Sequence, residues 1–193
     1  MVATAQELVA AHGFVTVTME QIARQAGVSV ATVYIYFPGK SAIVAALADE
    51  IVAAADLSVE QVESEPDPIR QLEIGAGILR RLNERAWLVA DILRSAHGRD
   101  AGLNAIWQRW QDRHLDAMRR GIGALYAQGA LRPDLPLDDA VDIFYALAGT
   151  DVYRALVRER GWVPDQYERW LFQHACRELF AGSHRMPAES PTE

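Results

Sequence analysis

The stretch Thr18 to Lys40, TMEQIARQAGVSVATVYIYFPGK, constrains the fold more than any other part of the chain. Thr18 followed three residues later by Gln21 is a capping-box pattern, which predicts the start of a helix that ends at Gly27. A second short helix is expected over residues 30–37, because Pro and Gly follow it directly. Two short helices joined by a glycine-containing turn form a helix-turn-helix, whose second helix lies in the major groove of DNA.

The end of this stretch, AGVSVATVYIYFPGK followed by SAIVAAL, resembles the DNA-binding signature of the TetR family of bacterial transcriptional repressors. In that signature AGVS-x-x-T-hydrophobic-Tyr-x-x-Phe is followed closely by Lys. The resemblance implies an all-α fold with a three-helix amino-terminal head that carries the helix-turn-helix, and a larger helical body that binds ligand and dimerises. It also implies a ligand-responsive regulator, with repression favoured over activation, that a small effector releases from a palindromic DNA operator.

Several side chains of the head match the positions that contact DNA in the family. Hydroxyl and ammonium groups reach phosphate oxygens, whereas side chains near the start of the second helix face base edges. The expected DNA-binding residues are Thr18, Val30, Ala31, Thr32, Tyr34, Tyr36 and Lys40. The alternative makes Thr32 and Tyr34 ordinary capping and packing residues. Val30 and Ile35 depart from the family pattern, because they carry no hydrogen-bonding group.

The charge of the chain argues against strong DNA binding. The formal net charge is −7, whereas nucleic-acid binders usually carry a basic surface. Up to residue 48 the charges are Glu7, Glu20, Arg24 and Lys40, so the head is neutral and the acidity belongs to the body. The family generally has a basic segment before the first helix, and its absence here indicates either a truncated start or a weakly binding head. A helical ligand-binding or interaction protein that has lost DNA binding is therefore the alternative.

The rest of the chain predicts a succession of amphipathic helices with no strand pattern. A first helix is expected over Ala3 to His12. The helices expected after the head cover Ser41 to about Leu57, Pro68 to about Ala86, Trp87 to Ala96, Asp100 to about Gln128, Leu137 to about Glu159, and Pro164 to about Ala181. The acidic, proline-containing segment Ser58 to Pro68 reads as the main loop. The expected domains are 1–45 for DNA binding, 46–182 for effector binding and dimerisation, and a disordered tail over 183–193.

Aromatic residues of the body are the candidates for a ligand pocket. Trp107, Trp110 and His114 fall at i, i+3 and i+7, hence on one helix face. The complete set expected to bind an apolar or aromatic effector is Trp87, Asp91, Trp107, Trp110, His114, Phe144, Tyr145 and Asp151. For any one of these residues, a place in a packed core is the alternative.

The two carboxy-terminal helices carry more apolar surface than one body face requires, which favours a two-fold homodimer. The expected interface residues are Ala148, Val152, Leu156, Trp170, Leu171, Ala175 and Leu179. The alternative is that both helices pack inward.

The sequence gives little support to catalysis, so an enzyme is a distant third hypothesis, and it indicates no cofactor. The five histidines are scattered, no metal-binding spacing appears, and the single cysteine, Cys176, excludes an intramolecular disulfide. No apolar run is long enough to cross a bilayer, and no signal peptide is recognisable. A cytoplasmic protein that is not an enzyme, with no metal and no membrane partner, is expected.

Overall fold

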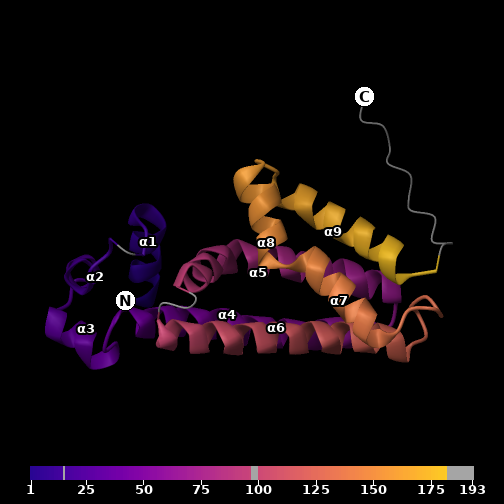
Figure 1. Ribbon diagram of the computed structural model, residues 1–193, viewed down its shortest axis with the longest axis horizontal. Coiled ribbons are helices and arrows are strands. Elements are labelled where there is room, and N and C mark those ends of the chain that lie inside the picture. Colours follow the sequence, from indigo (N-terminus) through magenta and orange to yellow (C-terminus); the bar gives the residue numbers. More distant parts are fainter. Residues whose placement is uncertain (15, 97–99, 182–193) are drawn as a thin grey trace.

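The computed structural model describes residues 1–14, 16–96 and 100–181, apart from the side chains of 52–59 and 96. Within these ranges the chain is helical, and Leu131 and Phe180 form an isolated bridge between loop segments. The all-α fold class is confirmed, whereas the expected tail over 183–193 lies outside the described residues. The elements are α1 Val2–His12, α2 Met19–Ala26, α3 Val30–Tyr36, α4 Lys40–Glu63, α5 Pro68–Ala96, α6 Ala101–Ala127, α7 Leu137–Ala148, α8 Thr150–Tyr153, the π-helical segment η1 Arg154–Glu159, and α9 Pro164–Leu179 (Figure 1).

Helices α1 to α3 form the head, and local hydrogen bonds set their ends. Thr18 Oγ1 accepts from the Gln21 amide at 3.3 Å, while Gln21 Oε1 accepts from the Thr18 amide at 2.8 Å, which completes the predicted capping box. Gly27 ends α2 with a φ of 68°, a left-handed conformation that glycine adopts without strain. Ser29 Oγ then caps α3 by accepting from the Thr32 amide at 3.0 Å. The helix-turn-helix predicted for this stretch is therefore present.

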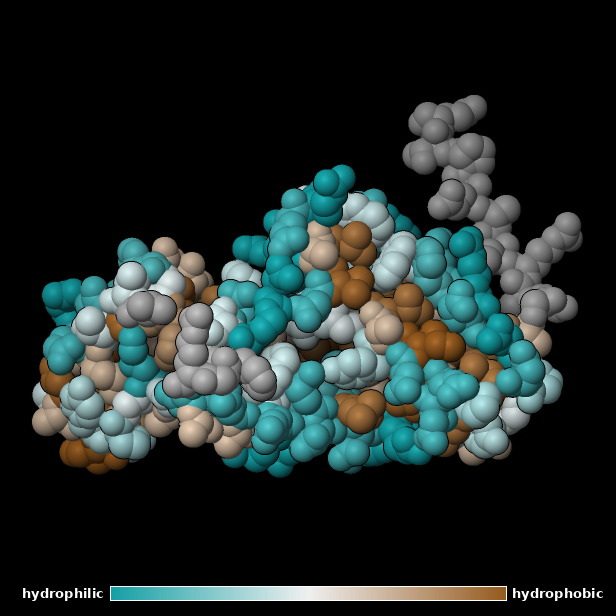
Figure 2. Space-filling model, in the orientation of Figure 1, coloured by the Kyte–Doolittle hydropathy of each residue, from teal (hydrophilic) through white to brown (hydrophobic). Residues whose placement is uncertain are grey.

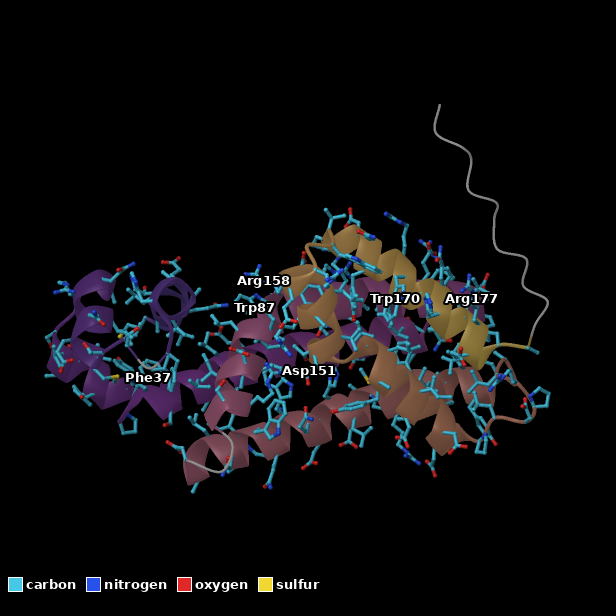
Figure 3. All side chains as sticks on the ribbon, turned by 45° about the horizontal axis from the view of Figure 1, so that its top comes forward. Phe37, Trp87, Asp151, Arg158, Trp170 and Arg177 are labelled. Atoms are coloured by element: carbon cyan, nitrogen blue, oxygen red, sulfur yellow. The ribbon has the colours of Figure 1, made fainter. Side chains whose placement is uncertain are left out.

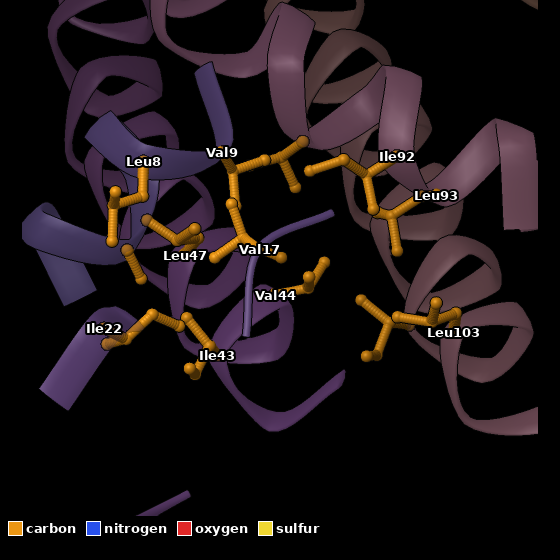
Figure 4. Packing of buried hydrophobic residues seen from close by; sticks show 14 of the residues in the cluster. Leu8, Val9, Val17, Ile22, Ile43, Val44, Leu47, Ile92, Leu93 and Leu103 are labelled. Atoms are coloured by element: carbon orange, nitrogen blue, oxygen red, sulfur yellow. The ribbon is translucent and has the colours of Figure 1, made fainter. Parts of the chain in front are cut away.

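The head shares its core with one end of the body. Val9 of α1 and Val17 of the following loop lie in one buried cluster with Val44 of α4, Leu93 of α5 and Leu103 of α6 (Figure 4). Burial of these side chains contributes to stability in proportion to the apolar area removed from water. Because the cluster is continuous and closely packed, a displacement of α4, α5 or α6 at this end shifts the side chains of the head that pack against it.

The body is a bundle in which α4 and α6 run side by side along one edge, α9 lies on the opposite side, and α5 lies between that pair and α9 (Figure 1). Arg120 of α6 holds Glu63 of α4 through two bonds of 2.9 and 2.7 Å. Arg80 of α5 pairs with Glu168 of α9 at 3.0 Å. At Gly77 an added Cβ would lie 3.1 Å from Glu168 Oε1, so glycine there permits the close approach of α5 and α9.

Two of the expected helix ends are wrong. Helix α4 does not end near Leu57 but continues to Glu63, so most of the expected loop over Ser58 to Pro68 is helical. The acidic side chains of this stretch do not stop a helix whose neighbours α5 and α6 pack along it. Helix α5 likewise continues through Trp87 to Ala96 instead of dividing into two helices.

The helix expected over Leu137 to Glu159 is broken at Gly149. Gly149 has φ −59° and ψ 148°, which is extended backbone, and α8 and the π-helical η1 follow it. The carbonyl oxygen of Ala148 loses its helical partner at this break. It accepts instead from Asn83 Nδ2 at 3.1 Å, and the Tyr167 hydroxyl lies 3.4 Å from it. The buried break is thus compensated by side chains of α5 and α9.

Among the described residues, no single helix is both long and apolar enough to cross a membrane. Helices Val30–Tyr36 and Lys40–Ile51, which meet at a bend of 56°, pass such a test of length and composition only when they are taken together.

Candidate nucleic-acid interface and ligand cavity

Helix α3 presents one buried side chain to the head and the others to solvent. Val33 is fully buried, whereas Tyr34, Ile35 and Tyr36 are 47%, 78% and 65% exposed. Val30 and Ala31 are exposed too, and Thr32 is half-buried beside its partner Ser29. Three large apolar or aromatic side chains on the surface of so short a helix are unusual for a face without a partner.

Thr18 and Lys40 lie at the two ends of the helix-turn-helix. Thr18 is exposed at the N-terminus of α2, where backbone amides point outward and favour an anion. Lys40 is half-buried at the start of α4, and its Nζ donates to the carbonyl oxygen of Phe14 at 3.0 Å. The same Nζ lies 4.9 Å from the centre of the Phe14 ring. Lys40 therefore ties α4 to the α1–α2 loop, a role that the sequence did not indicate.

The main cavity of the body lies between α4, α5 and α6. It holds about 950 Å³ of empty space, part of it open to solvent. Its walls are mostly apolar and include Trp110, Met118 and Phe144. The polar or charged side chains that line it are Gln71, Asn83, Arg113, His114 and Thr150. A concave, mostly apolar space with a few polar groups is typical of a small-molecule site.

Gln71 and Asn83 are the buried amides of this cavity. Gln71 donates through Nε2 to the Gly121 carbonyl oxygen at 3.4 Å and accepts through Oε1 from Gln128 at 3.0 Å. Asn83 donates to Ala148 and to the Tyr167 hydroxyl, at 3.1 and 3.3 Å. Burial raises the pKa of that hydroxyl, while its bond to Asn83 works in the opposite direction. Both amides thus join neighbouring helices as well as line the cavity.

His114 is a titratable group whose pKa is strongly affected by burial. It belongs to the walls of the main cavity and of a second cavity beside it, and its ring lies 5.8 Å from the ring of Tyr145. Its Nε2 atom is buried without a hydrogen-bond partner. Burial lowers the pKa of His114 to about 4, so the ring is uncharged at neutral pH. A buried nitrogen without a partner costs about 1–3 kcal/mol, which a ligand that supplies the partner recovers.

The second cavity is more polar and lies where α5, α6 and α7 meet the break at Gly149. Trp107, Tyr145 and Asp151 line it. Gln111 Nε2 donates to the Tyr145 hydroxyl at 2.8 Å, and Arg94 forms ion pairs with Asp91 and Asp151. Of the residues expected to bind an effector, the structure places Trp107, Trp110, His114, Phe144, Tyr145 and Asp151 on the walls of the two cavities.

Trp87 and Asp91 line neither of these two cavities, so their role in effector binding stays a prediction. Trp87 of α5 packs under Arg158 of η1, whose guanidinium carbon lies 4.3 Å from the centre of the ring (Figure 3). Asp91 is held by Arg94 at 2.6 Å. Both were chosen for residue type alone, and the direction of a side chain on α5 depends on helices that lie far away in sequence.

Four residues of the expected dimer interface face the interior of their own chain. Ala148, Leu171, Ala175 and Leu179 have no exposed surface, so they have none to offer a partner. Val152, Leu156 and Trp170 are half-buried and retain surface. Ile143 and Leu147 of α7 and Phe172 of α9 are also half-buried, and Figure 2 shows a hydrophobic surface between these two helices.

Sequence reasoning missed Gln71, Asn83, Arg113 and Thr150 as cavity residues. The signal available for the first two was a polar amide within an apolar stripe, since Gln71 precedes Leu72 and Asn83 follows Leu82. Arg113 and Thr150 gave no such signal. In the described part of the chain, no group of three His, Cys, Asp or Glu side chains is arranged to hold a metal ion.

Comparison with known proteins identifies the head. Residues 2–47 match the model of the bacterial regulatory proteins, tetR family. The chain is 38% identical over 80 residues to the HTH-type transcriptional regulator EthR of Mycolicibacterium smegmatis. That alignment covers 40% of this chain but only 37% of the length of EthR.

The whole chain has the fold of solved regulators. It superimposes on SmeT bound to triclosan with a TM-score of 0.77 and 18% identity, covering 100% of this chain and 95% of that one. SmeT is the repressor of a Stenotrophomonas maltophilia multidrug efflux pump. FadR of Bacillus subtilis, in complex with stearoyl-CoA, gives a TM-score of 0.74 and 15% identity, covering 95% of this chain and 97% of that one. At such identities the likeness shows the fold alone.

Proposed function

We propose that this chain, whose amino-terminal domain belongs to the tetR family of bacterial regulatory proteins, is a ligand-responsive transcriptional regulator that binds DNA as a homodimer. The observation that carries the proposal is the exposed face of α3 within a complete helix-turn-helix. Ile35 and Tyr36 are exposed, so they do not contribute to the core of the head and are available to contact a partner. We favour repression over activation as its effect on transcription, as for SmeT, which is a repressor.

In the proposed complex α3 enters the major groove. The hydroxyls of Thr18, Thr32, Tyr34 and Tyr36 contact phosphates, whereas Val30 and Ala31 face the bases. The positively charged Lys40 ammonium, which donates to the Phe14 carbonyl oxygen, lies near a phosphate in this complex. A neutral head gains little from phosphate attraction, so two heads on two half-sites are needed for useful affinity.

The proposed dimer forms through α7, the segment after Gly149, and α9. The half-buried apolar side chains there are Ile143, Leu147, Val152, Leu156, Trp170 and Phe172. A two-fold arrangement pairs each of these surfaces with its own copy. Half-site spacing of about one helical turn then follows from the separation of the two heads.

The proposed effector is a small apolar or aromatic molecule held in the main cavity. Trp110, Phe144 and Met118 supply apolar walls, and the uncharged ring of His114 supplies a hydrogen-bonding group. SmeT and FadR were solved with triclosan and stearoyl-CoA, which are ligands of those proteins. Trp107, Tyr145 and Asp151 of the second cavity contact any polar extension of the effector.

Helix α4 links the effector to the head. Ile51 and Val62 line the main cavity, while Val44 of the same helix belongs to the core shared with the head. An effector that moves α4 therefore changes the separation of the two heads, and a coupling free energy of about 1–3 kcal/mol suffices for useful induction. Structures with and without effector that show the same head separation would exclude this mechanism.

DNA binding is tested with duplexes from the region upstream of the gene that encodes the chain. We expect a palindromic fragment to bind, and the affinity to fall as salt rises, because phosphate contacts release counterions. Failure of the chain, and of a version extended at its amino end, to bind any such fragment favours the alternative of a ligand-binding protein that no longer binds DNA. Our proposal includes a cytoplasmic location, and a regulator of this kind needs neither catalytic residues nor a cofactor.

A further inference from the structure

The outermost ridge of α3 is aliphatic. Successive residues of an α-helix turn by about 100°, so Ala31 and Ile35 project almost opposite to the fully buried Val33. Ala31 is exposed and Ile35 is 78% exposed. Because these two side chains lie one turn apart on the same line, they form the part of α3 that reaches furthest from the head.

Polar groups lie beside this ridge rather than on it. Tyr34, next to Val30, lies on one flank, and Thr32 and Tyr36 lie on the other. Ser29, which caps α3, uses its hydroxyl for the Thr32 amide and also lies 2.7 Å from the Thr32 hydroxyl. The hydroxyls are therefore positioned to contact the walls of the major groove. The methyl groups of Ala31 and Ile35 would contact its floor. Figure 2 shows hydrophobic side chains at the surface of the head over α3.

The major groove offers one apolar group to such a ridge. Adenine, guanine and cytosine present donors and acceptors, and only thymine presents a methyl group, at C5. The side chains of Ala31 and Ile35 carry neither a donor nor an acceptor. They form no hydrogen bond with the polar edges of the bases, and they leave those edges without partners. Contact with thymine methyls instead removes apolar area of both molecules from water.

Resting on the DNA-binding function proposed above, we infer that α3 reads its half-site through thymine methyl groups, with Ile35 as the main specificity-determining residue and Ala31 beside it. The operator half-site carries thymines where these two side chains meet the floor of the groove. Hydrogen bonds to base edges contribute little to its sequence preference. The flanking hydroxyls position the helix without selecting a base.

The test begins with selection of binding sites by the full chain from a pool of random duplexes. Each thymine of the selected half-site is then replaced in turn by deoxyuridine, which removes the methyl group and leaves every hydrogen-bonding atom in place. We expect at least one replacement per half-site to weaken binding about fourfold, the effect of one buried methyl-sized group. We expect Ile35→Ala to bind the thymine and deoxyuridine duplexes equally.

Leu115→Ala is the matched control, because Leu115 is an exposed aliphatic side chain of α6. This variant is expected to discriminate between the two duplexes as the unaltered chain does. Circular dichroism establishes that Ile35→Ala stays folded, as its exposure predicts. If no deoxyuridine position weakens binding, or if Ile35→Ala keeps the discrimination, the inference is overturned while DNA binding stands. If no sequence is enriched from the pool, the proposed function itself fails.

Discussion

The Nδ2 atom of Asn83 donates a hydrogen bond to the carbonyl oxygen of Ala148 across 3.1 Å, at the residue where α7 ends. Asn83 is 2% exposed, and Ala148 is fully buried. The bond replaces the helical partner that the break at Gly149 removes. A single amide on α5 therefore holds the start of the segment that belongs to both the proposed dimer surface and the walls of the cavities.

Replacement of Asn83 by leucine is expected to destabilise the chain by about 1–3 kcal/mol, because the Ala148 carbonyl would stay buried with fewer donors. Urea denaturation followed by circular dichroism measures the change. Tyr167→Phe is the matched control: it removes the more distant hydroxyl, 3.4 Å from the same oxygen, and should cost less. Equal losses in the two variants would contradict the assignment of Asn83 as the main partner of this carbonyl.

The head could be predicted from sequence because its signals are local. Thr18, Gln21, Gly27 and Ser29 set helix ends through partners within a few residues, and the structure contains the predicted capping box. The break at Gly149 gave no such signal, because its compensating donors, Asn83 and Tyr167, lie on other helices. A glycine in a helical pattern is compatible with an unbroken helix until those neighbours are known.

The ligand cavity was predictable only in part for the same reason. Trp110 and His114 share one face of α6, which the sequence spacing shows, and both line the main cavity. Trp87 is as aromatic as Trp110, yet its face of α5 meets Arg158. Likewise Leu171 and Ala175 look suitable for an interface, but α9 turns them toward the body. The helical spacing of apolar residues identifies an apolar helix face, but it does not indicate which neighbouring surface covers that face.

His114 is expected to make stability depend on pH. Burial lowers its pKa from 6.5 to about 4 in the folded chain, so between these values the unfolded chain binds the proton more tightly. The free energy of unfolding should therefore fall as pH drops from about 6.5 to about 4, by up to about 3 kcal/mol from this group. Denaturation at several pH values measures the slope, which His114→Phe should reduce.

His12→Gln is the control for this series, because His12 is an exposed histidine at the end of α1. Its pH dependence should match that of the unaltered chain. A slope that persists unchanged in His114→Phe would mean that other groups cause it.

Glutamate at Ile143 or Leu147 is expected to separate the proposed dimer into monomers. A carboxylate on the half-buried surface of α7 stays hydrated in the monomer but is desolvated in an interface. Without an oppositely charged partner, this desolvation raises the free energy of the dimer. Light scattering after gel filtration gives the molar mass, and circular dichroism excludes unfolding. Leu115→Glu on α6 introduces the same charge outside the proposed interface and should leave the mass unchanged. A dimer that survives both α7 variants would place the interface elsewhere.

Lys40 and Tyr36 should differ in what they contribute to the head. Tyr36 is 65% exposed, so Tyr36→Phe removes a hydroxyl from the DNA-facing surface and is expected to weaken DNA binding across sequences without changing stability. Lys40→Ala is expected to weaken DNA binding and also to destabilise the head by about 1 kcal/mol, because the Phe14 carbonyl loses its donor and the Phe14 ring loses its cation. Fluorescence anisotropy with labelled duplexes and thermal denaturation separate the two effects. Thermal stability that is unchanged by Lys40→Ala would show that its contact with the α1–α2 loop contributes nothing, and that its role is confined to DNA.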